Sequence, residues 1–356
     1  MNKDILKYSR DIYVTPFNKG EIMYFETILP LEGEEITTLF PIEKVYFVTN
    51  YGLNIVYKEG KDYEVINGKL RLTENSRIKT LSLDQYYLKK PTYPLKINKQ
   101  TCPYKFNEDR YVLFGEGDFI TKKQITITYK HKIDDSLYSQ KDQSEKLSRF
   151  FNKIKKDKTA TILFYGDSIT VGCNSSGTEY GGNSKPYAES WPVMVNKTIE
   201  NRLNVKLKYL NTAIGGANTK WGVDNVEERV NAFHPDLAIV GFGMNDGPLS
   251  KEEHIAQILE IVNKVKNKNP DCDIILISTT IPNPESEQSK WNQSSFYLEY
   301  EKLNLDHVAF VNMTKVHLDL LKRKKFRDMT GNNINHPNDF LARAYAQSVL
   351  KVMGIE

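Results

Sequence analysis

Apolar and polar residues alternate in short runs through the first third of the chain. Residues 44–48, 63–72 and 124–129 each show this period of two, which is typical of strands that bury one face of a sheet. Asn67-Gly68 divides the second run, and these two residues favour the positive φ angles of a two-residue hairpin turn. The pattern predicts an all-β sandwich domain over residues 1–135.

The pattern changes after residue 135. Residues 136–158 are mostly polar, but four apolar side chains recur at helical spacing, namely Leu147, Phe150, Phe151 and Ile154. We expect this segment to be a helical connector between two domains.

From residue 159 onward the apolar runs are continuous. Five of them are predicted strands, with amphipathic segments between them: residues 161–165, 207–213, 236–242, 273–279 and 307–312. Continuous runs are typical of parallel strands, because helices bury both faces of such a sheet. Residues 159–356 are therefore predicted to form an α/β domain with an open, doubly wound parallel sheet.

Composition narrows the class of protein. The 356-residue chain has 49 basic and 45 acidic side chains that are interspersed, so its net charge of +4 does not indicate a nucleic-acid partner. No apolar stretch reaches the roughly 20 residues that span a membrane, and no hydrophobic signal segment follows Met1, so we expect a cytoplasmic protein. Cys102, Cys173 and Cys272 are far apart and odd in number, which fits reduced thiols better than disulfides or a metal site. The oligomeric state stays open.

The first predicted strand of the α/β domain ends in Gly166-Asp167-Ser168. Ligands of such sheets bind beyond the carboxyl ends of the strands, so a serine at this point would present its hydroxyl to a ligand. The alternative is that Asp167 or Ser168 only caps the helix that follows. The tripeptide by itself does not decide between the two.

Three later segments add polar groups at the same edge of the sheet. Gly215-Gly216 follows the second strand, Asn245 follows the third, and His336 precedes the last helix. Each has an ordinary structural alternative, since such residues also form turns and loops. Together with Ser168 they supply the groups that acyl transfer needs: a serine nucleophile, a histidine base and donors for an oxyanion. The predicted donors are the backbone N–H groups of Ser168 and Gly216 and the side-chain amide of Asn245.

These four segments resemble the sequence blocks of the SGNH (GDSL-type) hydrolases. Residues 166–170 (GDSIT) are similar to the block that carries the serine, residues 215–216 (GG) to the glycine block, residues 243–246 (GMND) to the asparagine block, and His336 to the last block. The resemblance covers about residues 160–356. It implies a flavodoxin-like sheet, no metal or cofactor, and hydrolysis of esters, frequently acetyl groups on carbohydrates. Members that carry a β-sandwich before the hydrolase domain are often carbohydrate esterases.

One position departs from the resembled family. Its last block usually has an aspartate three residues before the histidine, where this chain has Asn333. A neutral amide can orient the ring of His336 but cannot stabilise its positive charge. Asn333, Asp339 and Asp328 are therefore candidates for orienting the ring, and a Ser-His dyad held by a backbone carbonyl is a further alternative. Asp339 could instead cap the last helix.

We therefore expect a serine esterase that hydrolyses small O-acyl esters, with O-acetyl as the first candidate, of a carbohydrate or related metabolite. Asp167 and Trp221 are predicted to contact the substrate, with Trp221 able to stack on a sugar. One alternative is an acyltransferase that uses the same site. Another is a non-catalytic carbohydrate-binding protein on a decayed hydrolase scaffold, which Asn333 suggests. The expected partner is a small-molecule or oligosaccharide ester, without nucleic acid, membrane, metal or cofactor.

Overall fold

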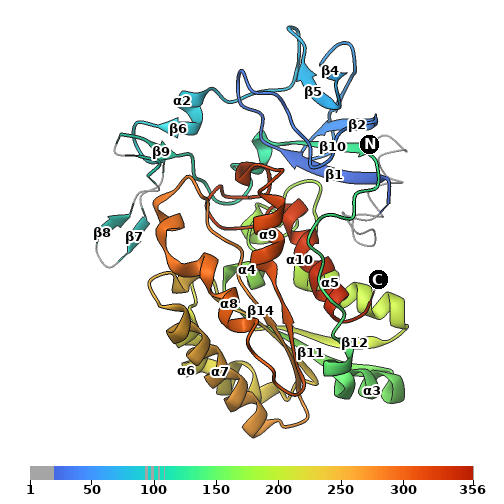
Figure 1. The fold of residues 1–356 in the computed structure, drawn as a ribbon, viewed down its shortest axis with the longest axis vertical. Coiled ribbons are helices and arrows are strands. Elements are labelled where there is room, and N and C mark those ends of the chain that lie inside the picture. The colour runs from blue at the N-terminus through green and yellow to red at the C-terminus, as the bar shows by residue number, and fades with distance from the viewer. Residues whose placement is uncertain (1–19, 93–94, 98–99, 103–104, 108, 356) are drawn as a thin grey trace.

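The computed structural model describes residues 20–355 except 93–94, 98–99, 103–104 and 108, so the first 19 residues of the predicted β-sandwich domain lie outside the described residues. Figure 1 shows antiparallel strands from the N-terminal part of the chain at one end of the molecule and a layered α/β structure at the other. No helix in the described ranges is long and apolar enough to cross a membrane.

The N-terminal strands are antiparallel, as the alternating pattern predicts. Four of them form one sheet in the order β1 (Ile22–Ile28), β10 (Ile125–Lys130), β2 (Lys44–Asn50) and β3 (Val56–Tyr57). The others form two-stranded pairs: β4 (Tyr63–Ile66) with β5 (Lys69–Leu72), β6 (Tyr87–Leu88) with β9 (Tyr111–Val112), and β7 (Leu95–Ile97) with β8 (Gln100–Cys102). Asn67 and Gly68 join β4 to β5 with φ angles of 52° and 74°, which confirms the predicted hairpin turn. The region also contains α2 (Leu83–Tyr86) and the 3₁₀ turn η2 (Thr121–Lys123). The antiparallel sheets confirm the predicted β domain.

The segment between the two regions is helical only in its second half, where the 3₁₀ turn η3 (Ser144–Leu147) leads into α3 (Ser148–Asp157). The chain before η3 is irregular, and at its end the Gln143 side chain binds the edge strand β15 (Val308–Val311). Gln143 donates from Nε2 to the Phe310 carbonyl (2.8 Å) and accepts at Oε1 from the Phe310 N–H (3.0 Å). The prediction of a helix over all of residues 136–158 is therefore corrected. The first half of the segment is not helical, and it protects the edge of the sheet at β15.

The C-terminal region contains a five-stranded parallel sheet. Its order is β12 (Lys206–Asn211), β11 (Thr159–Gly166), β13 (Leu237–Gly241), β14 (Asp273–Ile277) and β15. In this order the second strand lies outside the first, and the third to fifth follow on the other side, which is the flavodoxin-like arrangement. The predicted parallel α/β fold is confirmed.

Helices cover both faces of this sheet (Figure 1). On one face lie α3, α5 (Trp191–Leu203), α9 (Met313–Leu320) and α10 (Asp339–Val352); on the other lie α6 (Thr219–Arg229), α7 (Lys251–Lys268) and α8 (Tyr297–Tyr300). Along β11, Ile162 and Phe164 pack with the first group, and Leu163 and Tyr165 pack with the second. All four side chains are fully buried, which explains why the run is continuously apolar.

The short elements of this region lie in its connecting segments. They are α4 (Ser168–Val171) and the 3₁₀ turns η4 (Glu179–Gly181), η5 (Asn231–Phe233), η6 (Met244–Asp246), η7 (Glu287–Lys290), η8 (Asn292–Ser295) and η9 (Phe326–Asp328). The elements α4 and η6 follow directly on the carboxyl ends of β11 and β13. They therefore occupy the edge at which such sheets bind ligands.

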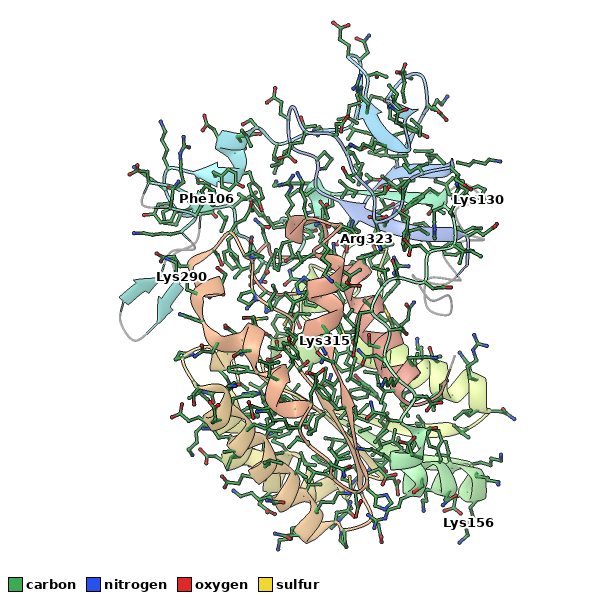
Figure 2. The ribbon with its side chains drawn as sticks, in the orientation of Figure 1. Phe106, Lys130, Lys156, Lys290, Lys315 and Arg323 are labelled. Carbon is green, nitrogen blue, oxygen red and sulfur yellow. The ribbon has the colours of Figure 1, made fainter. Side chains whose placement is uncertain are left out.

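The β domain and the α/β domain share a core. One apolar cluster includes Ile127 from β10 and Phe340 from α10. Beside it, Lys324 Nζ lies 2.7 Å from Glu26 Oε1, and both side chains are fully buried. Arg323, labelled near this junction in Figure 2, donates from Nη1 to Asp134 (2.8 Å). The β domain is therefore held firmly against loops at the carboxyl edge of the parallel sheet.

Candidate active site

Ser168 begins a short helix at the end of β11. The carboxylate of Asp167 caps this helix by accepting a hydrogen bond from the Ile169 N–H (2.9 Å). Gly166 makes the tight turn possible, because a Cβ at this position would lie 2.2 Å from the Gly241 carbonyl oxygen. Ser168 is 6% exposed, so only a small part of the residue is accessible to solvent.

The ring of His336 lies against this hydroxyl. Its Nε2 is 2.9 Å from Ser168 Oγ, although the two residues are 168 positions apart in the sequence. The loop that carries the histidine is built around Asn332, whose Oδ1 accepts hydrogen bonds from the N–H groups of Ile334 (3.0 Å), Asn335 (3.0 Å) and His336 (3.1 Å). This turn sets the direction of the histidine side chain.

Two polar groups face the other ring nitrogen. Asn174 Oδ1 lies 2.6 Å from His336 Nδ1, and Glu116 Oε2 lies 3.4 Å from the same atom. An oxygen at each of these positions assigns the ring proton to Nδ1, so that Nε2 is free to accept the serine proton. Sequence reasoning missed both residues. Glu116 is marked only by the glycines on either side of it, and Asn174 only by its place in the loop after α4.

Asn333, predicted as a ring orienter, points away from the histidine. Its backbone has a φ of 70°, and its side chain is fully buried against the β domain. Nδ2 donates to the Leu113 carbonyl (2.8 Å), and Oδ1 accepts from the Tyr86 hydroxyl (3.2 Å). The prediction is corrected because the Asn332-centred turn directs residue 333 to the domain border.

The two aspartates proposed as alternatives also have other partners. Asp339 Oδ1 accepts from the Ser176 N–H (2.9 Å), and Asp328 Oδ1 accepts from the Leu29 N–H (2.7 Å). Asp339 is not the cap of α10 either, because that position is taken by Asn338, whose Oδ1 accepts from the N–H groups of the two residues after Asp339. Burial raises the pKa of both aspartates. Among the described residues, the side chains that face Nδ1 of His336 are therefore Asn174 and Glu116, and neither aspartate does so.

The two loops predicted to hold the oxyanion lie next to each other. A Cβ on Gly215 would lie 4.0 Å from the Ser168 Cβ, and Gly216 has a φ of 78°, a conformation that favours glycine. Asn245, in η6, donates from Nδ2 to the carbonyl oxygen of Ala217 (2.9 Å). An amide carries two N–H hydrogens, so one is still available after this bond. The glycine turn and the asparagine loop are thus joined beside the serine.

The two residues predicted to contact substrate have structural roles. Asp167 is buried, and besides capping α4 its carboxylate interacts with the backbone at Met244, in the asparagine loop. Burial, together with the nearby Asp246 charge, raises the pKa of Asp167 to about 7. Trp221 lies on α6, partly buried, with its ring 5.9 Å from that of Tyr165. Asp167 therefore supports the serine turn, Trp221 packs beside Tyr165, and the predicted substrate contacts of both residues stay predictions.

Metal ligands and thiols do not contribute to the site in the part of the chain that the structure describes. No group of three or more histidine, cysteine or acidic side chains is arranged to hold a metal there. Cys173 and Cys272 are buried free thiols, and burial raises the pKa of each to about 12. Both are poor nucleophiles at neutral pH.

The strand order and the polar groups beyond the carboxyl ends of the strands define a flavodoxin-like α/β protein. A sequence model of the GDSL-like lipase/acylhydrolase family matches residues 164–343, about half of the chain. The protein belongs to this family, which confirms the resemblance to the SGNH (GDSL-type) hydrolases.

Other comparisons add relatives but no closer identity. A search of curated protein sequences found no match to the chain. An acetylxylan esterase from Geobacillus stearothermophilus aligns over 55% of this chain and 95% of its own, at 20% identity and a TM-score of 0.43. A two-domain esterase active on acetylated mannans aligns over 59% of this chain and 52% of its own, at 21% identity and a TM-score of 0.48. The chain therefore covers about half of that second protein, and the assignment to the family rests on the sequence model.

Proposed function

We propose that the protein is a serine esterase that hydrolyses small O-acyl esters, acetyl esters first among them, of a carbohydrate or a related metabolite. The observation that carries this proposal is the contact of 2.9 Å between His336 Nε2 and Ser168 Oγ, with the opposite ring nitrogen held by oxygen atoms. This is the geometry in which a histidine can act as general base toward a serine.

The reaction proceeds in two stages. Ser168 Oγ attacks the carbonyl carbon of the ester while its proton passes to His336 Nε2, and the carbonyl electron pair moves to the oxygen. When this intermediate collapses, the bond to the leaving alcohol breaks, and the alcohol takes the proton from Nε2. Water then attacks the acyl-serine and gives its proton to Nε2. The second intermediate collapses to a free carboxylic acid as the serine oxygen recovers that proton.

The negative oxygen of both intermediates needs hydrogen-bond donors. The Ser168 N–H, the Gly216 N–H and the remaining amide hydrogen of Asn245 are proposed for this role. Their support is the position of the glycine turn, where a Cβ on Gly215 would lie 4.0 Å from the Ser168 Cβ, and the bond from Asn245 to the carbonyl of Ala217. Donors held in place before the reaction stabilise charge that appears only in the transition state.

The small acyl group, with acetyl as the first candidate, is proposed on the resemblance to the SGNH (GDSL-type) hydrolases, which frequently remove acetyl groups from carbohydrates. The carbohydrate part of the proposal rests on the resemblance to family members that carry a β domain before the hydrolase domain.

The reason for considering a decayed, non-catalytic scaffold was Asn333 at the usual aspartate position. That reason loses its force because His336 has other partners, Asn174 and Glu116. An acyltransferase would use the same first stage and differ only in the acceptor of the second. Hydrolysis and acyl transfer are therefore distinguished by identifying the acceptor of the acyl group, which is water or a sugar hydroxyl.

The experiment measures release of acetate from p-nitrophenyl acetate and from a panel of O-acetylated sugars by wild-type protein, Ser168→Ala and the control Ser289→Ala. Acetate release by wild type and the control, but not by Ser168→Ala, supports the proposal. A fluorophosphonate should label wild type and the control at Ser168. Undiminished hydrolysis or labelling in Ser168→Ala would refute it. Acetyl transfer to added sugar in place of acetate release would indicate the acyltransferase.

A further inference from the structure

A turn of the β domain reaches the ring of His336. Glu116 lies in this turn, between β9 and η2, and outside the residues matched by the family model. We propose that the Glu116 carboxylate is the charge partner of His336, so that the β domain completes the active site of the hydrolase domain. This inference rests on the proposed function and adds a positioning residue to it.

The backbone around Glu116 is shaped to present this side chain. A Cβ on Gly115 would lie 2.2 Å from the ring of Phe119, and Gly117 has a φ of 65°, so glycine is favoured on both sides of the glutamate. The Gly117 carbonyl accepts a hydrogen bond from Asn174 Nδ2 (2.8 Å), the same residue whose Oδ1 contacts the histidine. The turn is therefore fastened to the hydrolase domain next to the ring.

The carboxylate itself is oriented by groups of the α/β domain. Glu116 Oε1 accepts from Asn332 Nδ2 (3.1 Å), while Oε2 faces His336 Nδ1 at 3.4 Å. Partial desolvation of the Glu116 carboxylate, whose side chain is 51% exposed, raises its pKa, but the interactions with His336, Asn332 and Asn174 outweigh this and hold the pKa below the ordinary value. The side chain is ionised at neutral pH and supplies a negative charge beside the ring.

Asn174 and Glu116 have separate tasks at Nδ1. The shorter contact, 2.6 Å to Asn174 Oδ1, fixes the ring orientation and keeps the proton on Nδ1. A neutral amide cannot stabilise the imidazolium that forms when Nε2 takes the serine proton, whereas the carboxylate at 3.4 Å can. Together they do what one aspartate does in the usual triad.

Other ionisable groups near the ring do not replace Glu116. Asp167, on the helix of the nucleophile, interacts with His336 by charge, but burial raises its pKa to about 7, so it is partly neutral when the enzyme works. The thiol of Cys173 lies close enough to Glu116 to be affected by its charge, and its own pKa of about 12 keeps it neutral. Of these groups near the ring, Glu116 is therefore the one that is fully ionised at neutral pH.

The test compares Glu116→Gln with the matched control Asp118→Asn, which removes the same charge two residues away, where the carboxylate pairs with Lys122. Opposite unit charges at the distance found here favour each other by roughly tenfold even in the dielectric of water. We expect kcat of Glu116→Gln toward p-nitrophenyl acetate to fall about tenfold. The acidic limb of kcat/KM should move about one pH unit lower, because the ring then binds its proton less readily. The control should change neither.

Two outcomes would overturn the inference: wild-type kcat and pH profile in Glu116→Gln, or a fall in kcat that the control reproduces or that leaves the acidic limb in place. Melting curves show whether the variants are folded, and Glu116→Ala is the second variant. The His336 ring titration, followed by NMR, separates this inference from the proposed function. If wild type hydrolyses no ester, the titration midpoint should still move lower in Glu116→Gln, and an unmoved midpoint would refute the pairing.

Discussion

Replacing Asn333 by aspartate tests whether the position or the surroundings of this residue decide its role. In the resembled family an aspartate at this place orients the histidine, so Asn333→Asp restores the usual residue. In this structure the side chain is fully buried, donates to the Leu113 carbonyl at 2.8 Å and has no path to His336 without leaving those partners. We expect kcat of the folded variant to stay within about twofold of wild type, because the new carboxyl stabilises no charge on the ring.

The same change should destabilise the protein in a way that depends on pH. A carboxylate cannot donate to the Leu113 carbonyl, so the introduced carboxyl group must take up a proton to keep that hydrogen bond. Holding an acid with an ordinary pKa near 3.9 in its neutral form costs about 1.4 kcal/mol for each pH unit above that value. The loss of unfolding free energy is therefore about 4 kcal/mol at pH 7 and about 1.5 kcal/mol at pH 5.

Urea unfolding at the two pH values, together with kcat toward p-nitrophenyl acetate, measures both effects. Asn335→Asp is the matched control, because Asn335 uses its side-chain oxygen as an acceptor from Asn332 (2.9 Å), and an aspartate can do the same. The control should lose less than about 0.5 kcal/mol. A rise in kcat of Asn333→Asp at unchanged stability would show that residue 333 reaches the histidine and that the reasoning is wrong.

Three further changes probe other parts of the site and its support. Asn245→Ala should lower kcat by about 10² to 10³ with little change in KM, and loss of stability alone would contradict its role as an oxyanion donor. The pKa of Asp167 is about 7 in the folded state and about 4 in the unfolded state, so between these pH values the folded protein holds a proton that the unfolded protein has released. The unfolding free energy of wild type therefore falls as pH rises from about 4 to about 7. Urea unfolding of Asp167→Asn should lack this part of the pH dependence. Lys324→Met leaves the carboxylate of Glu26 buried without its cation, so we expect a loss of about 3–5 kcal/mol in urea unfolding, largely recovered by adding Glu26→Gln.

The sequence by itself determined the two kinds of sheet and the region of the site. A period of two predicts strands with one buried face, and continuous apolar runs predict strands buried on both faces; the packing of Ile162 and Leu163 on opposite sides of β11 bears this out. The segments that carry Ser168, Gly216 and Asn245 each follow directly on a strand. Because parallel strands all end at one edge of the sheet, the local sequence pattern alone predicts that these segments lie close together.

Only the tertiary structure decided which groups surround the histidine. The direction of each side chain in the loop before α10 depends on the hydrogen bonds around Asn332, and one turn of backbone sends Asn333 to the domain border and His336 to Ser168. Glu116 reaches the ring from more than 200 positions away along the chain, because a buried ion pair and a shared apolar cluster dock the β domain. Such contacts join residues far apart in sequence, so no pattern within either segment predicts them. The partners of the His336 ring therefore follow from tertiary packing. The sheet edge on which the ring lies follows from the order of strands and loops along the sequence.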